Sequence, residues 1–310
     1  MTGKSRIAIV GGGLMGHGIA QVFACAGHSV RVQDPSADVL ATLDARIRRN
    51  LRELGLEETA ADRVSGHVFL EAAVADAEVI IEAGPENLAL KQQLFAAIEA
   101  SAPVESLLAS NTSVIPITQI MALLRHPDRA LGTHWWNPPY LVPLVEVIRT
   151  SATSAAAVAA MTSLLKAVGK TPVTVEKDVP GFVGNRLQHA LWREAIALVE
   201  QGVCDAETVD TVVKASFGRR LAVLGPLENA DLVGTDLTLA IHETVLPDLD
   251  RTPGPLPVLR QLVADGKLGM KSGEGFRRWT PEQQSELRRR VFAHLLALDD
   301  KGTPRTGEEK

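Results

Sequence analysis

His134 and Glu146 have the side chains and the spacing of a general base and a carboxylate partner. His134 lies near the end of one apolar run, residues 130–136, and Glu146 lies inside a second, residues 144–148. A carboxylate within such a run is costly to bury unless it is paired. If the two runs are adjacent strands, the carboxylate can fix the imidazole tautomer and stabilise the imidazolium that forms on proton uptake. On spacing alone, a structural histidine with Glu146 facing solvent at a sheet edge fits equally well.

The chemistry that needs such a base is the oxidation of an alcohol, in which the hydroxyl proton leaves while a hydride passes to a nicotinamide. A glycine turn that could bind this cofactor follows the apolar residues 7–10. In its Gly-x-Gly-x-x-Gly pattern, Gly11 makes the tight turn and Gly13 lets the backbone approach a pyrophosphate. Gly16 lets the next helix pack closely against the strand. The turn therefore predicts a dinucleotide site.

Residues on either side of this helix indicate which dinucleotide is bound. The helix begins at Leu14 and Met15 and directs free N–H groups at the phosphates. After the second predicted strand, Asp34 lies 18 residues past Gly16, where an acid accepts the adenine-ribose hydroxyls. Its carboxylate would repel a 2′-phosphate, and residues 35–37 offer no arginine to bind one. These features predict NAD rather than NADP.

The composition is that of an ordinary globular protein, with 310 residues, 45% of them hydrophobic. A net charge of −5 argues against a nucleic-acid partner, and the basic residues 46–49 are interpreted as a solvated helix face. The only cysteines, Cys25 and Cys204, give no disulfide framework, and no metal-binding spacing is present. No apolar run approaches the roughly 18 residues that span a bilayer. Because no signal-type segment is present either, we expect a cytoplasmic protein without a membrane partner.

Strands and helices alternate up to about residue 175, which is typical of a parallel, doubly wound sheet. Strands are expected at residues 7–10, 29–33, 67–69, 78–82, 107–109, 130–136, 144–148 and 171–175. Helices are expected at residues 37–54, 88–100 (capped by Asn87) and 155–168, and then at 183–201, 206–216, 226–245, 256–264 and 283–298, before a frayed end at 301–310. We therefore predict an α/β fold, with a Rossmann-type, mostly parallel sheet in residues 1–177 and an all-α C-terminal domain in residues 178–310.

Several motifs, taken in order, resemble the 3-hydroxyacyl-CoA dehydrogenase family. They are Gly-Gly-Gly-Leu-Met-Gly-His-Gly-Ile-Ala (11–20), Pro-Glu-Asn-Leu-x-x-Lys (85–91), Ser-Asn-Thr-Ser (110–113), His-x-x-Asn-Pro (134–138) with Glu146, Val-Pro-Gly-Phe-Val-x-Asn-Arg-Leu (179–187), Gly-Pro (225–226) and Lys-Ser-Gly-Glu-Gly-Phe (271–276). The resemblance covers nearly the whole chain. It implies an NAD-dependent homodimer whose helical domain serves substrate binding and supplies most of the dimer contact.

The resemblance also implies catalytic roles for residues that match its motifs. His134 would be the general base and Glu146 its partner. Ser113 would hydrogen-bond the substrate oxygens, and Asn185 would reach the site from the second domain. Without the resemblance, Ser113 would be a turn residue and Asn185 a polar group at a helix start.

Three further residues receive binding roles from the same resemblance. Glu86 and Lys91 would lie near the ribose on the nicotinamide side, and Asn137 would help to shape the substrate pocket. The alternative for Glu86 and Lys91 is an exposed helical pair that contributes only tenths of a kcal/mol.

Two features differ from the family members that use CoA thioesters. The segment between Asp34 and the strand at 78–82 is shorter than the one that holds CoA, and residues 54–59 are acidic. The approach to the Gly-Pro motif, residues 217–224, is similar to that of a non-CoA branch: L-gulonate 3-dehydrogenase (lambda-crystallin) and a pyridine-carboxylate dehydrogenase. Arg220 in this segment could bind a substrate carboxylate bidentately, or it could be a surface arginine at a helix end.

The sequence thus predicts an enzyme that oxidises a 3-hydroxy group to a 3-oxo group with NAD, acting on a small free hydroxy acid. A hydroxyacyl-CoA of fatty-acid metabolism is the alternative substrate, and a hydrated aldehyde could use the same base. An NAD-binding structural protein without turnover is the alternative of another class, and the complete set of site residues argues against it. A serine hydrolase is rejected because no Gly-x-Ser-x-Gly elbow is present.

Overall fold

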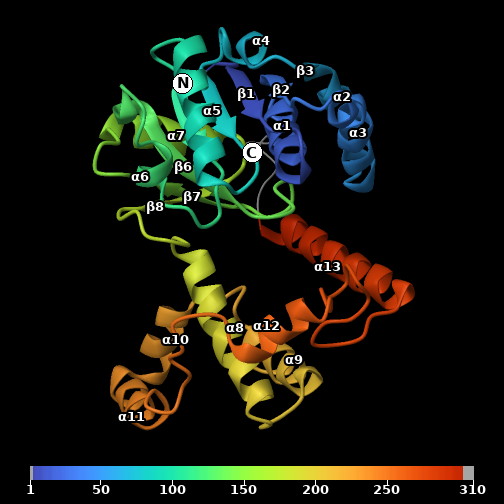
Figure 1. The fold of residues 1–310 in the computed structure, drawn as a ribbon, viewed down its shortest axis with the longest axis vertical. Coiled ribbons are helices and arrows are strands. Elements are labelled where there is room, and N and C mark those ends of the chain that lie inside the picture. Colours follow the sequence, from blue (N-terminus) through green and yellow to red (C-terminus); the bar gives the residue numbers. More distant parts are fainter. Residues whose placement is uncertain (1–2, 303–310) are drawn as a thin grey trace, which may run out of the picture. The chain divides into compact units, whose positions relative to one another are not determined.

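The computed structural model describes residues 3–302, and these divide into two compact units (Figure 1). The first unit runs to Asn185 and takes in the described chain from Ala293 onward, and the second spans Arg186–Phe292. The second unit thus begins eight residues after the boundary predicted from the sequence. The residues before it are tied to the first unit, because Asp178 accepts a hydrogen bond from the Thr118 N–H, and Val183 and Asn185 donate to the Glu146 carboxylate and the Ser113 carbonyl oxygen. Most of the predicted frayed end, residues 303–310, lies outside the described residues.

The first unit contains an eight-stranded sheet in the order β3-β2-β1-β4-β5-β6-β7-β8. Its strands are β1 (Arg6–Val10), β2 (Ser29–Gln33), β3 (Val64–His67), β4 (Val79–Glu82), β5 (Leu107–Ser110), β6 (Ala130–Trp135), β7 (Leu144–Ile148) and β8 (Thr171–Val175). All neighbouring pairs are parallel except β6 and β7, which are antiparallel. The strand order reverses direction between β1 and β4, which is where doubly wound sheets bind their ligands. The predicted fold class is confirmed.

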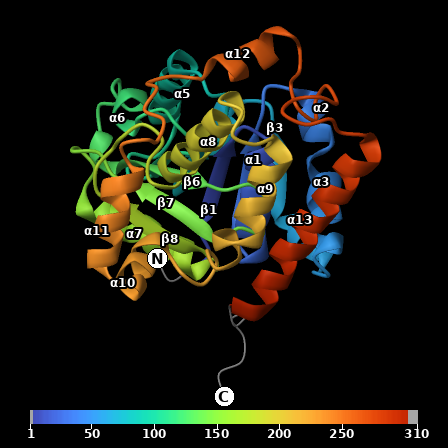
Figure 2. The same ribbon diagram turned by 90° about the horizontal axis from the view of Figure 1, so that it is seen from below.

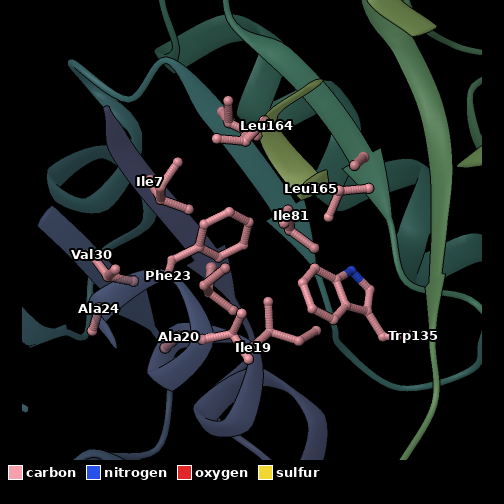
Figure 3. Packing of buried hydrophobic residues seen from close by; sticks show 14 of the residues in the cluster. Ile7, Ile19, Ala20, Phe23, Ala24, Val30, Ile81, Trp135, Leu164 and Leu165 are labelled. Atoms are coloured by element: carbon pink, nitrogen blue, oxygen red, sulfur yellow. The ribbon is translucent and has the colours of Figure 1, made fainter. Parts of the chain in front are cut away.

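Helices cover both faces of this sheet, because successive strand residues point to opposite sides. The first-unit helices are α1 (Leu14–Cys25), α2 (Ala37–Ala41), α3 (Leu43–Glu53), α4 (Leu70–Val74), α5 (Leu88–Ser101), α6 (Ile117–Ile120), α7 (Ala155–Ala167) and the short 3₁₀ segments η1 (Glu58–Arg63) and η2 (Pro127–Arg129). On one face, Ile7 and Ile81 pack in one cluster with Phe23 of α1, Trp135 of β6 and Leu165 of α7 (Figure 3). On the other face, apolar residues of α4, α5 and α6 pack against the alternate strand positions.

The second unit is helical, as predicted (Figure 2). It holds α9 (Ala206–Ala215), η3 (Phe217–Arg219), α10 (Pro226–Val233), α11 (Thr235–Val245), α12 (Pro257–Ala264), most of α8 (Gly184–Glu200) and part of α13 (Pro281–Gly302). The described part of this unit has two isolated β-bridges at Glu274 and no strand. In the described chain, no helix combines the length and the apolar character that crossing a membrane would require.

Three predicted elements differ from the structure. The strand expected at 67–69 is instead Val64–His67, and Phe69, which is 73% exposed, precedes α4. The helix expected at 37–54 is interrupted at Thr42, and the one expected at 226–245 is interrupted at Gly234, whose φ is +101°. In the two helices, the apolar pattern continues across a break that the backbone makes, so periodicity alone could not locate the break.

Candidate active site

The glycine turn between β1 and α1 has the geometry that a pyrophosphate site requires. Gly11 has a φ of +106°, and a Cβ there would lie 2.8 Å from the carbonyl oxygen of Ala83. A Cβ on Gly16 would lie 1.7 Å from the Gly11 carbonyl oxygen, so the helix packs directly against the turn. A Cβ on Gly13 would meet nothing within 4 Å. The backbone at Gly13 is therefore open to a ligand, and it lies at the start of α1.

Asp34, at the end of β2, is oriented toward this turn. One carboxylate oxygen accepts a hydrogen bond from the Gly12 N–H at 2.9 Å, and the other accepts one from the Ser36 N–H at 2.9 Å. Leu14 is 66% exposed at the open side of the turn, whereas Met15 packs against the core. A half-buried carboxylate beside an open glycine turn fits the adenine ribose of a dinucleotide without a 2′-phosphate.

His134 and Glu146 form a buried pair across two adjacent strands. They are directly opposite residues of the antiparallel pair β6 and β7, and His134 Nδ1 lies 2.7 Å from a carboxylate oxygen of Glu146. The residues are 3% and 1% exposed. The alternative in which Glu146 faces solvent at an edge is wrong, because β8 pairs with the other side of β7 and makes it an internal strand.

The second carboxylate oxygen of Glu146 is also occupied. It accepts hydrogen bonds from the backbone N–H groups of Val183 at 2.9 Å and Gly184 at 3.1 Å. Burial raises the pKa of Glu146, but the hydrogen bond with His134 and those two N–H groups outweigh burial and hold the pKa below its ordinary value. Glu146 is therefore an anion fixed from two sides.

Two aromatic rings pack around the His134 imidazole. The ring centroids of Trp136 and Phe182 lie 5.1 and 5.7 Å from that of His134. Phe182 is fully buried and has a φ of +51°, in a region that non-glycine residues rarely adopt. Phe182 directly precedes Val183 and Gly184, whose N–H groups donate to Glu146. The sequence motif contained Phe182, but its spacing gave no sign of this role.

Glu86 and Ser113 lie in the loops that follow β4 and β5, and Asn185, at the start of α8 and still in the first unit, contacts Ser113. The Asn185 amide donates to the Ser113 carbonyl oxygen at 2.8 Å, and the Ser113 N–H donates to a Glu86 carboxylate oxygen at 2.8 Å. The same oxygen accepts from the Thr112 hydroxyl and the Val114 N–H. Burial raises the pKa of Glu86, but these donors and Lys91 lower it overall. Ser113 remains exposed, with its backbone anchored to Glu86.

Lys91 is buried, so the alternative in which Glu86 and Lys91 form an exposed helical pair is wrong. Its side chain is 1% exposed, and Nζ donates to both carboxylate oxygens of Glu82, at 2.8 and 3.0 Å. Glu86 is a further partner at 3.5 Å. Glu82 also accepts from the Ser110 hydroxyl and the Gly84 N–H. Glu82, which sequence reasoning missed, thus links the ends of β4 and β5 to α5, and its place inside an apolar strand was the available signal.

We expect Glu82→Gln to lower the free energy of unfolding by about 3 kcal/mol, because it leaves the Lys91 ammonium buried without a counter-charge. Urea titration measures the change. The double variant Glu82→Gln/Lys91→Met should recover most of the loss, since the uncompensated charge is gone. Glu286→Gln, which breaks the exposed pair with Arg289, should leave the urea midpoint unchanged. A midpoint unaltered by Glu82→Gln alone would contradict this account of the network.

Two predicted substrate residues have less defined surroundings. Asn137 is exposed in the loop after β6, and the bond between Asn137 and Pro138 is cis. Its neighbour Pro139 contacts α1 closely, because a Cβ on Gly18 would lie 2.6 Å from it. Arg220 belongs to the second unit, where it follows η3 and is exposed. The substrate roles of both residues stay predictions.

A Rossmann-type sheet with an open glycine turn, an oriented acid and a buried imidazole–carboxylate pair defines a nicotinamide-dependent dehydrogenase. Comparison with known proteins agrees. Residues 6–179 match the NAD binding domain of 3-hydroxyacyl-CoA dehydrogenase, and residues 181–279 match its C-terminal domain. The chain belongs to the 3-hydroxyacyl-CoA dehydrogenase family, and it is an NAD-dependent dehydrogenase.

Individual relatives differ in their substrates. The 5-formyl-3-hydroxy-2-methylpyridine 4-carboxylate 5-dehydrogenase of Mesorhizobium japonicum is 36% identical over 305 residues, which cover 94% of this chain and 96% of the relative. A crystal structure of an enzyme of that name, described as an NAD⁺-dependent dismutase, has a TM-score of 0.90 at 34% identity and covers 97% of this chain and 100% of its own. A probable 3-hydroxybutyryl-CoA dehydrogenase of Bacillus subtilis is 38% identical over 279 residues, 87% of this chain and 96% of the relative.

Proposed function

We propose that this dehydrogenase oxidises a 3-hydroxy group to a 3-oxo group on a small free carboxylic acid, with His134 as the general base. The observation that supports the base is the buried pair of His134 and Glu146, with 2.7 Å between Nδ1 and the carboxylate. A carboxylate can only accept a hydrogen bond, so this pair selects the tautomer with the proton on Nδ1. Nε2 is then free to accept the substrate's hydroxyl proton.

The roles of the chain's own residues follow from this tautomer. As the hydroxyl proton moves to Nε2, the imidazole becomes a cation, and the fixed Glu146 carboxylate stabilises it. Trp136 and Phe182 limit the orientations of the ring. We assign the substrate oxygens to Ser113, whose carbonyl oxygen accepts a hydrogen bond from the Asn185 amide beside it. NAD, which the glycine turn and Asp34 would hold, would supply the hydride acceptor for the carbon that carries the hydroxyl group.

The preference for a free acid rests on the segment where members that use CoA thioesters hold the CoA part of their substrate. In this chain, only four residues separate α3 from η1, and two arginines of α3 are already paired with carboxylates. Arg48 binds Asp44 and Asp62, and Arg52 binds Glu58. A CoA phosphate would have to displace these partners. The M. japonicum relative is named for a substrate with a free carboxylate, which agrees with this proposal.

Oxidation of an aldehyde hydrate is a second candidate function. The observation that favours it is the formyl group in the name of that same relative, which matches 94% of this chain. A hydrated aldehyde presents a hydroxyl group on the carbon that loses hydride, so Nε2 of His134 could remove its proton in the same way.

The proposal is tested by NADH formation on three matched substrates: a free 3-hydroxy acid, its CoA ester, and an aromatic aldehyde that bears an adjacent carboxylate. We expect kcat/KM for the free hydroxy acid to exceed that for the ester by about tenfold or more, because one desolvated charge pair gives at least that discrimination. A higher value for the ester would overturn the free-acid proposal. A higher value for the aldehyde would establish the second candidate.

Arg220 gives a separate prediction about the carboxylate. If its guanidinium binds the substrate carboxylate, Arg220→Ala should raise KM for an acid about 10- to 100-fold and leave KM for the matching amide or thioester within about twofold. Steady-state kinetics on the three compounds measures this. Arg219→Ala is the matched control, because Arg219 is adjacent to Arg220 and its side chain is exposed as well. An equal rise in KM for all three compounds would exclude Arg220 as the carboxylate anchor.

We also propose that the protein is a homodimer through its helical unit. Large apolar side chains are exposed there, among them Val223 at 85%, Leu227 at 80% and Leu232 at 72%. Apolar surface of this kind is typical of protein interfaces. Light scattering of the purified chain measures its mass in solution, and a monomeric mass at micromolar concentration would exclude the proposal. The cytoplasmic location stays a prediction.

A further inference from the structure

Arg46, on α3, reaches the glycine turn through its guanidinium group. Nη2 donates to the carbonyl oxygens of Gly12 at 2.9 Å and Val39 at 3.0 Å, and Nη1 lies 3.5 Å from the carbonyl oxygen of Gly13. The side chain is half-buried. The interpretation of Arg46 as part of a solvated face is therefore wrong. The cause is tertiary, since these carbonyls lie up to 34 residues away in sequence.

The other arginines of α3 do not share this position. Arg48 and Arg52 form ion pairs with nearby carboxylates, and Arg49 is 61% exposed beside Glu53. Among the four arginines of this helix, Arg46 is the one that binds the glycine turn. Arg49, three residues further along the same helix, is therefore a natural control for it.

The hydrogen bond to Gly12 determines which way a peptide N–H points. A peptide unit is planar and trans, so its C=O and N–H point in opposite directions. When Arg46 holds the Gly12 carbonyl, the N–H of Gly13 is directed away from Arg46. In the next peptide unit, the Gly13 carbonyl accepts from the His17 N–H at 3.2 Å, and His17 Nδ1 lies 2.8 Å from it. The Leu14 N–H belongs to the same peptide unit as the Gly13 carbonyl, so it is directed away from His17 and Arg46.

These two N–H groups lie at the start of α1, beside the open space at Gly13. A pyrophosphate bound there needs N–H groups and not carbonyl oxygens in front of it. The glycines themselves cannot enforce this, because glycine adopts many backbone conformations at similar energy. A side chain that holds the carbonyls on the far side supplies the missing constraint.

We propose that Arg46 is a positioning residue for NAD, which holds the Gly12 and Gly13 carbonyls so that the N–H groups of Gly13 and Leu14 face the pyrophosphate. Arg46 acts through the turn, and its five donors are directed to backbone carbonyls and toward His17. The proposal rests on NAD binding by this family and not on His134 as base. It therefore stands or fails independently of the substrate and of the proton transfer.

The test compares binding of ADP, which has a pyrophosphate, with binding of adenosine, which has none. Calorimetry is performed on the full-length wild type, Arg46→Met, Arg46→Lys and Arg49→Met. We expect Arg46→Met to weaken ADP about 10- to 100-fold and adenosine less than about twofold, because only the pyrophosphate needs the ordered turn. Arg46→Lys should also weaken ADP about tenfold, because one ammonium cannot hold carbonyls that diverge around a planar guanidinium. Arg49→Met should bind both ligands like the wild type.

Three results would overturn the proposal. Wild-type affinity for ADP in Arg46→Met would show that the turn needs no clamp. Wild-type affinity for ADP in Arg46→Lys would show that a positive charge is sufficient. Equal losses of affinity for ADP and adenosine in Arg46→Met would show a general structural role. Melting temperatures without ligand establish that each variant is folded. If Arg46→Met does not fold, the test uses Arg46→Lys and Arg46→Gln, which both retain a hydrogen-bond donor. A larger loss of affinity for ADP than for adenosine in these variants supports the proposal, and equal losses overturn it.

Discussion

Replacing His134 by glutamine is expected to lower kcat by about 10²- to 10⁴-fold, the range that general base catalysis supplies. Glutamine can still hydrogen-bond Glu146 across the strands, so the fold should survive, but its amide cannot take up a proton. Steady-state rates of NADH formation measure the loss.

Two controls separate proton transfer from structural damage in this variant. NADH binding, followed by fluorescence, should be unchanged, because the glycine turn and Asp34 are untouched. His28→Gln replaces another buried histidine, which accepts a hydrogen bond from the Ser5 N–H at 3.0 Å, and it should retain normal kcat. Near-normal turnover by His134→Gln with NAD bound would exclude His134 as the base.

Replacing Glu146 by glutamine is expected to lower kcat by about 10³-fold, because it should leave His134 in the wrong tautomer. The N–H groups of Val183 and Gly184 can only donate, so they should take the carboxamide oxygen. The carboxamide NH₂ would then face His134 Nδ1 and donate to it. An imidazole that accepts at Nδ1 carries its proton on Nε2, where the substrate's proton must go.

The pH dependence of stability checks the same residue. The pKa of Glu146 is lower in the folded protein than its ordinary value of 4.5, so the ionised carboxylate stabilises the fold above pH 4.5. This contribution is lost as the pH falls from 4.5 through the lowered pKa. The difference in unfolding free energy between the wild type and Glu146→Gln should therefore narrow over that range. A kcat within tenfold of wild type, or a stability difference that does not change with pH, would contradict the assigned role.

The sequence by itself determined the features that depend on local pattern. Apolar runs alternate with helical segments, so the doubly wound sheet could be predicted, and β7 and β8 have the predicted limits. Asn87 caps α5 as expected, because an N-cap acts on the N–H of a residue three positions later. The glycine turn and Asp34 predicted NAD because that motif lies within one short βαβ unit. His134 and Glu146 were recognised as candidates, but their pairing was not determined.

The tertiary structure decided every question that depends on distant neighbours. Whether Glu146 is paired or exposed depends on β8, a strand later in the sequence that pairs with the far edge of β7. Lys91 can be buried because the Glu82 carboxylate at the end of β4 pairs with it. Arg46 contacts the glycine turn because the fold brings α3 beside that turn. A charged side chain has the same appearance in a sequence whether water or a buried partner surrounds it. Its free energy differs greatly between those surroundings, and only the fold selects one of them.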